Sequence, residues 1–203
     1  MQIIAHRGAS GDYPENTLLA IEQAIAQGAD AVEIDVFAVD GELIVIHDHH
    51  LARTTNGSGS IYEYNLAQLQ QLDAGRGQRI PTLWQVLQLL APTALWLNIE
   101  LKGDNTVAPL LALLDNAKHQ LGIDHQRLVI SSFNHHLLAA IKQQRPELKL
   151  GALTASLPLD YAAFAQTLQA YSVNCDVSFI NQAFVADATA RGLKVYVYTV
   201  DQA

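Results

Sequence analysis

Short apolar runs alternate along this chain with stretches in which apolar residues recur at the spacing of an α-helix. The first run, residues 2–6 (QIIAH), precedes a predicted helix over about residues 17–27, whose apolar positions share one face. Gly28 is typical of the residue that ends a helix. This part of the chain therefore predicts a strand, a polar loop and an amphipathic helix.

Further strands are predicted from short runs rich in branched apolar residues. They span residues 31–39, 42–47, 95–101, 127–133, 148–154, 173–180 and 194–200. Asp40 and Gly41 predict a tight turn that joins the first two of these strands as a hairpin. A helix is expected to begin near Thr82, and other helical stretches separate the later strands. Because strands and helices alternate, the sheet should be mostly parallel.

Two α/β architectures fit this alternation, an open doubly wound sheet and a TIM (β/α)8-type barrel. No GxGxxG motif follows the first strand, which weakens the dinucleotide-binding form of the open sheet. The number of units and the polar residues at the ends of the strands favour the barrel. A small excursion at about residues 49–80 interrupts the alternation, and we expect a single domain over residues 1–203.

The barrel is expected to be truncated after its seventh strand. The seven strands contain His6, Asp35, Glu100, Ile130, Ala152, Cys175 and Val197, and the hairpin strand 42–47 lies outside this count. Such a barrel needs eight strands, because strand number, tilt and stagger are linked. We therefore expect a fragment, or closure by another chain. Two open edges roughly 9–10 Å apart would otherwise allow self-association.

Composition and charge narrow the class of protein. Half of the 203 residues are hydrophobic and 16% are charged, which favours a globular domain with a sizeable core. The net charge of −8 argues against binding the backbone of nucleic acids, but a few local cations can still attract a small anionic substrate. Cys175 is the single cysteine, and no signal peptide or apolar run of ~20 residues is present, so we expect a cytoplasmic location and no membrane span.

Two carboxylates occupy alternate positions of the strand 31–39. Glu33 and Asp35 therefore point to one face, where burying both without partners would be costly. Carboxylate oxygens are the ligands that Mg²⁺ and Ca²⁺ prefer, so this pair predicts a divalent cation. An edge strand with a solvated polar face is the alternative, and the apolar flanks argue against it.

The strand 95–101 and the residue that follows it repeat this pattern. Asn98, Glu100 and Lys102 share a face, so Glu100 is a candidate third ligand of the same cation. Lys102 lies one step nearer the strand end, where it can meet a phosphate oxygen. An ion pair between Glu100 and Lys102 at the rim of the barrel is an equally good interpretation of this motif alone.

Two of the eight histidines differ from the rest. His6 and His47 each end an apolar strand, and each is followed at once by a polar residue, Arg7 or Asp48. Beside a metal, two such histidines can act as general acid and general base. Either one alone is better explained as a histidine that is hydrogen-bonded at a strand end. The other six fall in loops or helical stretches, and most are expected to be exposed: His49, His50, His119, His125, His135 and His136.

These segments, in order, resemble the glycerophosphodiester phosphodiesterase family of the bacterial cytoplasmic type. The resemblance is carried by HRGAS and PENT, GADAVEIDV, DGELIVIHD, LARTTNGSG, RIPTL and NIELK. It is specific over residues 3–102 and looser afterwards, at VISSF and VYVYTV. It implies a (β/α)8 barrel that hydrolyses glycerophosphodiesters to sn-glycerol 3-phosphate and an alcohol, within glycerol and lipid metabolism, using Mg²⁺ or Ca²⁺.

The resemblance also implies a role for individual residues. It assigns catalysis to His6 and His47, metal binding to Glu33, Asp35 and Glu100, phosphate binding to Arg7 and Lys102, and a second shell or pocket to Glu15, Asp48, Phe133 and Tyr198. Tyr198 stands where the family often has tryptophan. The attacking oxygen belongs to water or to the glycerol 2-hydroxyl of the substrate.

Two alternatives to this activity remain. The first is a lipid-directed phosphodiesterase or phospholipase on the same barrel, ranked second because the sequence shows no basic amphipathic helix or exposed aromatic cluster. The second is a non-catalytic, truncated binding module, which the apparent loss of the eighth strand suggests.

Overall fold

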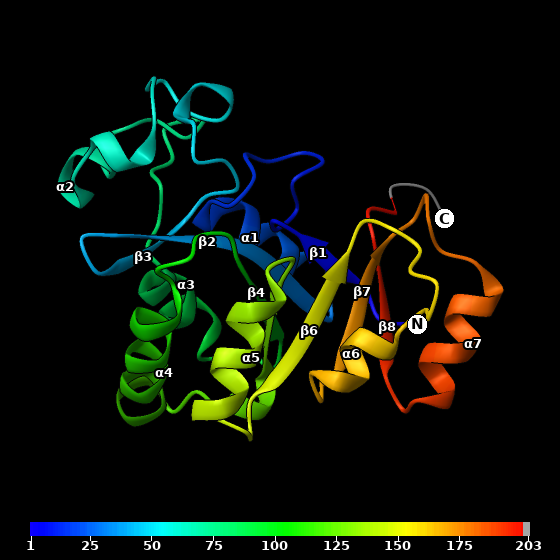
Figure 1. Cartoon of the computed structure of the whole chain (residues 1–203). Helices are drawn as coiled ribbons and strands as arrows, with labels where there is room; N and C mark the ends of the chain where they lie inside the picture. Colours follow the sequence, from blue (N-terminus) through cyan, green and yellow to red (C-terminus); the bar gives the residue numbers. More distant parts are fainter. Residues whose placement is uncertain (201–203) are drawn as a thin grey trace. The chain divides into compact units, whose positions relative to one another are not determined.

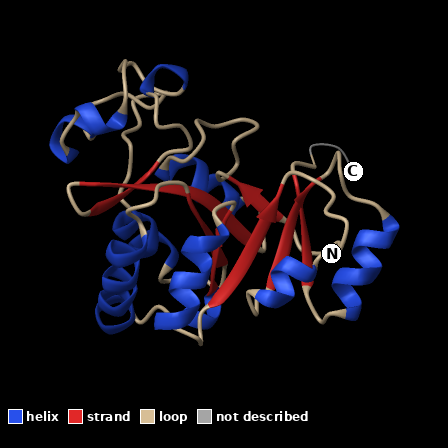
Figure 2. Ribbon diagram, viewed as in Figure 1, coloured by secondary structure: helices blue, strands red, loops and turns tan. Residues whose placement is uncertain are grey.

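The structure is a computed structural model of the 203-residue chain and describes residues 1–200 (Figure 1). The chain forms two compact units, the first over Met1–Arg127 and the second from Leu128 onward. Strands and helices alternate in both units (Figure 2). None of the helices described within residues 1–200 is long and apolar enough to cross a bilayer.

The first unit is built around a long central strand. Its strands are β1 (Ile4–His6), β2 (Ala31–Val39), β3 (Glu42–Val45) and β4 (Trp96–Leu101). β2 pairs in parallel with β1 and β4, and antiparallel with β3. The register places His6 opposite Glu33, and Asp35 opposite Glu100. Polar residues of three parallel strands are therefore neighbours across the sheet.

Three of the four α-helices described in this unit, the first three along the chain, begin at capping side chains. The four are α1 (Leu18–Ala26), the short α2 (Leu66–Leu69), α3 (Leu83–Leu90) and α4 (Val107–Leu121), with 3₁₀-helices η1 (Leu51–Arg53), η2 (Ile61–Glu63) and η3 (His125–Arg127). The Thr17 hydroxyl accepts a hydrogen bond from the amide of Ala20 at the start of α1. Thr82 and Gln85 form a capping box at the start of α3, where the sequence predicts a helix start.

Residues 49–80, hereafter the insertion, have a small core that they share with β2 and β3. In Figure 1 the insertion, drawn mainly in cyan, lies above β2 and β3. The buried residues of this core are Phe37, Val39, Ile44, Ile46, Leu51, Ile61, Leu69, Ala74 and Ile80. The hairpin turn before it has positive φ at Asp40 (54°) and Gly41 (81°), as the sequence predicts. The insertion is thus packed onto the hairpin and is not an extended loop.

The second unit contains four parallel strands in chain order. They are β5 (Leu128–Ser132), β6 (Lys149–Thr154), β7 (Ser172–Asp176) and β8 (Lys194–Tyr198), with helices α5 (His135–Gln144), α6 (Ala163–Thr167) and α7 (Gln182–Ala190) between them. Each strand pairs in parallel with the next. Ser131, Gly151 and Ser172 are partners across three of these strands.

The fold class is the one that the sequence predicts, an α/β fold of the TIM-barrel type. Seven strands of the barrel type lie within residues 1–200, together with the hairpin strand β3. Every described strand except β2 is shorter than its predicted run, β3 and β7 among them. β3 ends at Val45, so that His47 lies in the segment after it. β7 ends at Asp176, whose carboxylate accepts hydrogen bonds from the amide and the hydroxyl of Ser178 and turns the chain.

We expect Gly8 to be the more demanding of two glycines that both have left-handed backbone. At Gly8 (φ 80°) an added Cβ would lie 2.7 Å from the carbonyl carbon of Ala20, whereas at Gly28 (φ 79°) no heavy atom of the described residues lies within 4 Å. Gly28→Ala should therefore cost about 1–2 kcal/mol in the free energy of unfolding, from backbone strain. Gly8→Ala should cost roughly 1–3 kcal/mol more, from overpacking. Equal losses in urea denaturation would contradict this account of Gly8.

Candidate active site

Three carboxylates converge on one face of β2 and β4. Glu33, Asp35 and Glu100 are 7%, 1% and 7% exposed, and one oxygen of each lies within 4.8 Å of the others. The predicted convergence is therefore confirmed. An edge strand with a solvated face is the wrong interpretation, because all nine residues of β2 are buried.

These carboxylates are held in an environment that opposes their charge. Burial raises the pKa of Glu33 well above its ordinary value, and the charges of Asp35 and Glu100 raise it further. Burial also raises the pKa of Glu100, again with a contribution from Asp35. Within residues 1–200, Glu33 Oε1 is buried without a hydrogen-bond partner. Asp35 Oδ1 also lacks a hydrogen bond from the described residues, although Lys102 Nζ lies 3.4 Å away. Three close carboxylates with such buried, unsatisfied oxygens fit a hard divalent cation such as Mg²⁺ or Ca²⁺.

Two cationic side chains flank the carboxylates. Arg7 Nε lies 3.3 Å from Asp35 Oδ2, and the Arg7 amide donates to Glu33 Oε2 at 3.1 Å. Lys102 Nζ lies 2.6 Å from Glu100 Oε1 and 3.4 Å from Asp35 Oδ1. Burial acts to lower the pKa of Lys102, but the two carboxylates outweigh burial and raise it. The predicted ion pair of Glu100 and Lys102 thus exists within the carboxylate cluster, and the two interpretations of this motif are compatible.

The two predicted histidines lie beside the cluster and remain accessible. His6 Nε2 is 3.8 Å from Glu33 Oε2, and His47 Nδ1 is 2.5 Å from Asp48 Oδ1. Their side chains are 30% and 29% exposed, so a substrate can reach both. Burial lowers the pKa of His6, and the charges of Arg7 and His47 act in the same direction. The amide of Ile46, the residue before His47, donates to the Asp35 carbonyl at 3.0 Å, which places this segment beside the strand that carries the carboxylates.

Asn16 belongs to the site although sequence reasoning missed it. Its side-chain Nδ2 donates to Asp35 Oδ2 at 2.9 Å, and its side-chain Oδ1 accepts from the backbone amide of Asp35 at 3.3 Å. Asn16 adopts a left-handed backbone (φ 59°), which asparagine tolerates better than most residues. The PENT segment that contains it was the available signal, but the partner lies 19 residues away on another element.

Glu15 and Arg53 link the loop after β1 to the segment after β3, and these contacts of Arg53 were also missed. Glu15 accepts hydrogen bonds from both Arg7 and Arg53. Burial acts to raise the pKa of Glu15, but the two arginines outweigh burial and lower it. The hydrogen bond from Arg53 is the main cause that lowers the pKa of Asp48 to about 2. Glu15 and Asp48 are therefore held as charged carboxylates.

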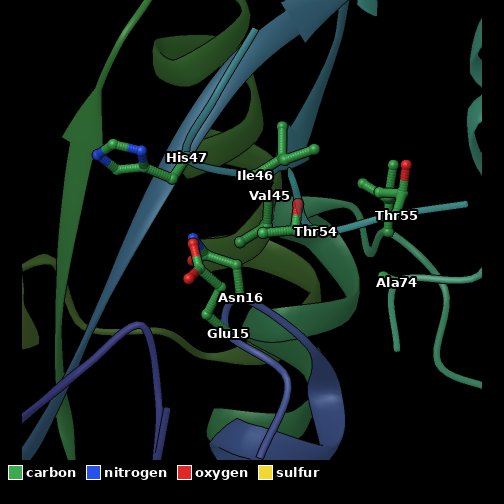
Figure 3. A pocket seen from close by; sticks show the side chains of 9 residues that line it. Glu15, Asn16, Val45, Ile46, His47, Thr54, Thr55 and Ala74 are labelled. Carbon is green, nitrogen blue, oxygen red and sulfur yellow. The ribbon is translucent and has the colours of Figure 1, made fainter. Parts of the chain in front are cut away.

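A small cavity lies next to these residues (Figure 3). Its lining comes from the loop before α1, from β3 and the residues after it, and from the insertion. Its size is that of about one water molecule, too small for a substrate. The buried Thr54 hydroxyl lines it and has no hydrogen-bond partner in the described part of the chain. The cavity therefore borders the candidate site residues Glu15, Asn16 and His47 and is too small to be the substrate site.

The remaining predicted pocket residues lie together in the second unit. The rings of Phe133 and Tyr198 meet edge to face, with centroids 6.2 Å apart. The Tyr198 hydroxyl donates to the carbonyl of Thr154 at 3.0 Å. Of the six histidines set aside, His125 is buried and contacts the Leu114 carbonyl, whereas His49, His50, His119 and His136 are exposed.

Comparisons with known proteins agree with this geometry. The chain matches the family model "Glycerophosphoryl diester phosphodiesterase family" over residues 6–203. It is 36% identical over 209 residues to a glycerophosphodiester phosphodiesterase of Caldanaerobacter subterraneus subsp. tengcongensis, covering 98% of this chain and 86% of the relative. A glycerophosphodiester phosphodiesterase of Bacillus altitudinis is also 36% identical, over 215 residues, with the same coverage of 98% and 86%.

Solved structures extend the likeness to the fold. A phosphodiesterase of Oleispira antarctica, in complex with the product sn-glycerol-3-phosphate, superposes with a TM-score of 0.91 and 34% sequence identity. The match covers 100% of this chain and 85% of that one. It supports the TIM-barrel fold class over the whole sequence.

We expect a divalent cation to stabilise the chain, because it relieves the repulsion among the three buried carboxylates. Mg²⁺ or Ca²⁺ at 100 times its dissociation constant should raise the free energy of unfolding by about 2.7 kcal/mol, or Tm by roughly 5–10 °C. Glu33→Gln removes one repelling charge and one ligand. Its Tm in EDTA should be no lower than that of the wild type, whereas its shift on adding the cation should fall by more than half.

Glu22→Gln is the matched control, since Glu22 is exposed on α1. It should keep the full cation-induced shift in differential scanning calorimetry. A Glu33→Gln chain that responds to the cation as strongly as the wild type would remove Glu33 from the ligand set.

Proposed function

The chain belongs to the glycerophosphoryl diester phosphodiesterase family of enzymes, and on that premise we propose that it hydrolyses glycerophosphodiesters to sn-glycerol 3-phosphate and an alcohol with a divalent cation. One observation carries the proposal. Three buried carboxylates, two accessible histidines and two cationic side chains gather at the strand ends of the first unit.

The carboxylates of Glu33, Asp35 and Glu100 would hold the cation. A divalent cation at this place supplies Lewis-acid stabilisation of the charge that develops on the phosphoryl oxygens. Arg7 and Lys102 contact Asp35 through opposite oxygens, so their charges face the same centre from two sides. They hold the substrate phosphate by hydrogen bonds to its non-bridging oxygens.

The two histidines move the protons of the reaction. One accepts the proton of the attacking oxygen as that oxygen bonds to phosphorus, and the other donates a proton to the alcohol oxygen as its bond to phosphorus breaks. Asp48 holds Nδ1 of His47, so Nε2 is the nitrogen that exchanges a proton with the substrate. The attacking oxygen comes from water or from the glycerol 2-hydroxyl, and a cyclic phosphate intermediate would accumulate only in the second case.

A lipid-directed phosphodiesterase on the same barrel is the second candidate, and one observation favours it. Exposed apolar side chains lie on three loops of the second unit: Phe133 after β5, Leu157 and Leu159 after β6, and Phe179 after β7. Loops that follow parallel strands share one edge of a sheet, so these side chains lie on the same edge of this unit. The sequence analysis found no exposed aromatic cluster; the structure exposes two single aromatic side chains here, Phe133 and Phe179.

We expect the wild-type chain to release glycerol 3-phosphate from glycerophosphocholine or glycerophosphoethanolamine only when Mg²⁺ or Ca²⁺ is present. His6→Ala and His47→Ala should each lower kcat by roughly 10²-fold or more, the usual contribution of a general acid or base. His119→Ala is the control, because His119 is exposed in the last turn of α4. A wild-type chain that binds these diesters without turnover would favour the binding module.

The two candidate substrate classes separate in a second assay. We expect kcat/KM for glycerophosphocholine to exceed that for lysophosphatidylcholine, because the charged groups of the site recognise the phosphate and not an acyl chain. Leu159→Ser should leave both values unchanged, since the Leu159 side chain is fully exposed. The reverse preference, together with a loss confined to the lipid substrate in Leu159→Ser, would establish the lipid-directed activity.

A further inference from the structure

Arg53 reaches the site from the insertion. It is the last residue of η1, whose first residue, Leu51, is fully buried in the core of the insertion. The Leu51 amide donates to the Gly59 carbonyl at 3.0 Å, and the Thr55 amide donates to the Leu51 carbonyl at 3.0 Å. Packing and backbone hydrogen bonds therefore place the backbone of Arg53, and its side chain is not needed to hold η1.

The Arg53 guanidinium contacts two carboxylates at once. Its two terminal nitrogens donate to the two oxygens of Glu15, at 2.9 and 2.8 Å, in a bidentate pair. Its Nε donates to Asp48 Oδ2. This use of three donors from one planar group is available to arginine and not to lysine, which presents a single point charge.

Each of these carboxylates also contacts a residue that has a role in the proposed mechanism, and the two residues differ. Glu15 Oε1 also accepts from Arg7 at 2.9 Å, and Asp48 Oδ1 contacts His47 Nδ1 at 2.5 Å. Arg53 is therefore the single group that both chains of contacts share. Three separate segments of the sequence, residues 7–15, 47–48 and 51–53, meet at its side chain.

We propose that Arg53 is a positioning residue that orients His47 through Asp48 and Arg7 through Glu15. The proposal rests on the proposed function of this site. A histidine that transfers a proton must keep one tautomer and one ring orientation, and small misplacements of such groups cost large factors in rate. Without Arg53, Asp48 and Glu15 would each keep one partner and gain rotational freedom.

The alternative is an ion pair that matters only for stability. The Arg53 side chain is 47% exposed, and exposed ion pairs commonly contribute little. Arg191 on α7 offers a matched control, because it also joins two partners, Asp187 and Gln166, outside the cluster. Comparing Arg53 with Arg191 separates positioning of the site from a general loss of surface contacts.

The first test compares Arg53→Met, Arg53→Lys and Arg191→Met in the full chain, with a glycerophosphodiester that the wild type hydrolyses. Arg53→Met should lower kcat/KM by roughly 10–100-fold, the range for groups that orient catalytic ligands, with a lower kcat and a higher KM. Arg53→Lys should recover only part of the loss. Arg191→Met should keep wild-type kcat and KM even if its Tm falls as much as that of Arg53→Met.

The second test separates the effect of Arg53 on His47, through Asp48, from its effect on Arg7, through Glu15. Asp48→Asn should act mainly on kcat, through His47, and Glu15→Gln mainly on KM, through Arg7. In a chain that carries both changes, adding Arg53→Met should lower activity no further, because Arg53 has already lost its two carboxylate partners. A full additional loss in that background would overturn the proposed route through Asp48 and Glu15.

A spectroscopic readout keeps this inference distinct from the proposed function. Long-range ¹H–¹⁵N spectra should show His47 of the wild type as a single Nδ1-protonated tautomer, which Arg53→Met converts to a tautomer mixture and Arg191→Met leaves unchanged. If the wild type hydrolyses no glycerophosphodiester, the proposed function fails, and the His47 spectrum still tests Arg53. An active wild type whose kcat, KM and His47 spectrum survive Arg53→Met would rule out the positioning role.

Discussion

The mutual repulsion of three buried carboxylates is the interaction on which the first unit depends. Glu33, Asp35 and Glu100 gather their oxygens within 4.8 Å on a face from which water is largely excluded. Nearby groups are arranged to offset that charge. Arg7 and Lys102 approach Asp35 through different oxygens, and Asn16 donates to the same carboxylate. The site is thus better understood as a charge distribution around two strands than as a set of separate catalytic residues.

This charge distribution dictates the backbone around it. Arg7, Gly8 and Asn16 all have positive φ in the loop between β1 and α1, an unusual concentration of left-handed backbone. That conformation lets the Arg7 amide reach Glu33 while the Asn16 amide group reaches Asp35. Gly8 meanwhile packs against Ala20 of α1 without a side chain. The strain of this loop is stored where the polar contacts converge, as is common at functional sites.

Sequence patterns predicted those parts of the site that follow from strand periodicity. Glu33 and Asp35 alternate on β2 and Glu100 faces them from β4, so their convergence needs only a parallel register, and β2 has the predicted bounds of residues 31–39. The contacts of Arg53 and Asn16 were not predicted, because they depend on tertiary packing and not on strand periodicity. Arg53 lies 38 residues from Glu15, and its side chain is placed by the packing of the insertion, which no local period encodes. The end of β3 was misplaced because apolar residues continue past the last ladder pair, at Val45, as far as Ile46.

The charges of the site also explain why a divalent cation suits it better than a monovalent one. Around the cluster lie five carboxylates (Glu15, Glu33, Asp35, Asp48 and Glu100) and three cationic side chains (Arg7, Arg53 and Lys102). With neutral histidines, these groups leave two negative charges, which one divalent cation balances. Burial raises the pKa of Glu33, and the neighbouring charges of Asp35 and Glu100 raise it further. A cation that balances this excess would let Arg7 and Lys102 attract a phosphodiester anion, as the proposed function requires. Arg53, Glu15 and Asp48 together add one positive and two negative charges to this balance. The positive charge comes from the insertion, which therefore affects the net charge of the site as well as the positions of its side chains.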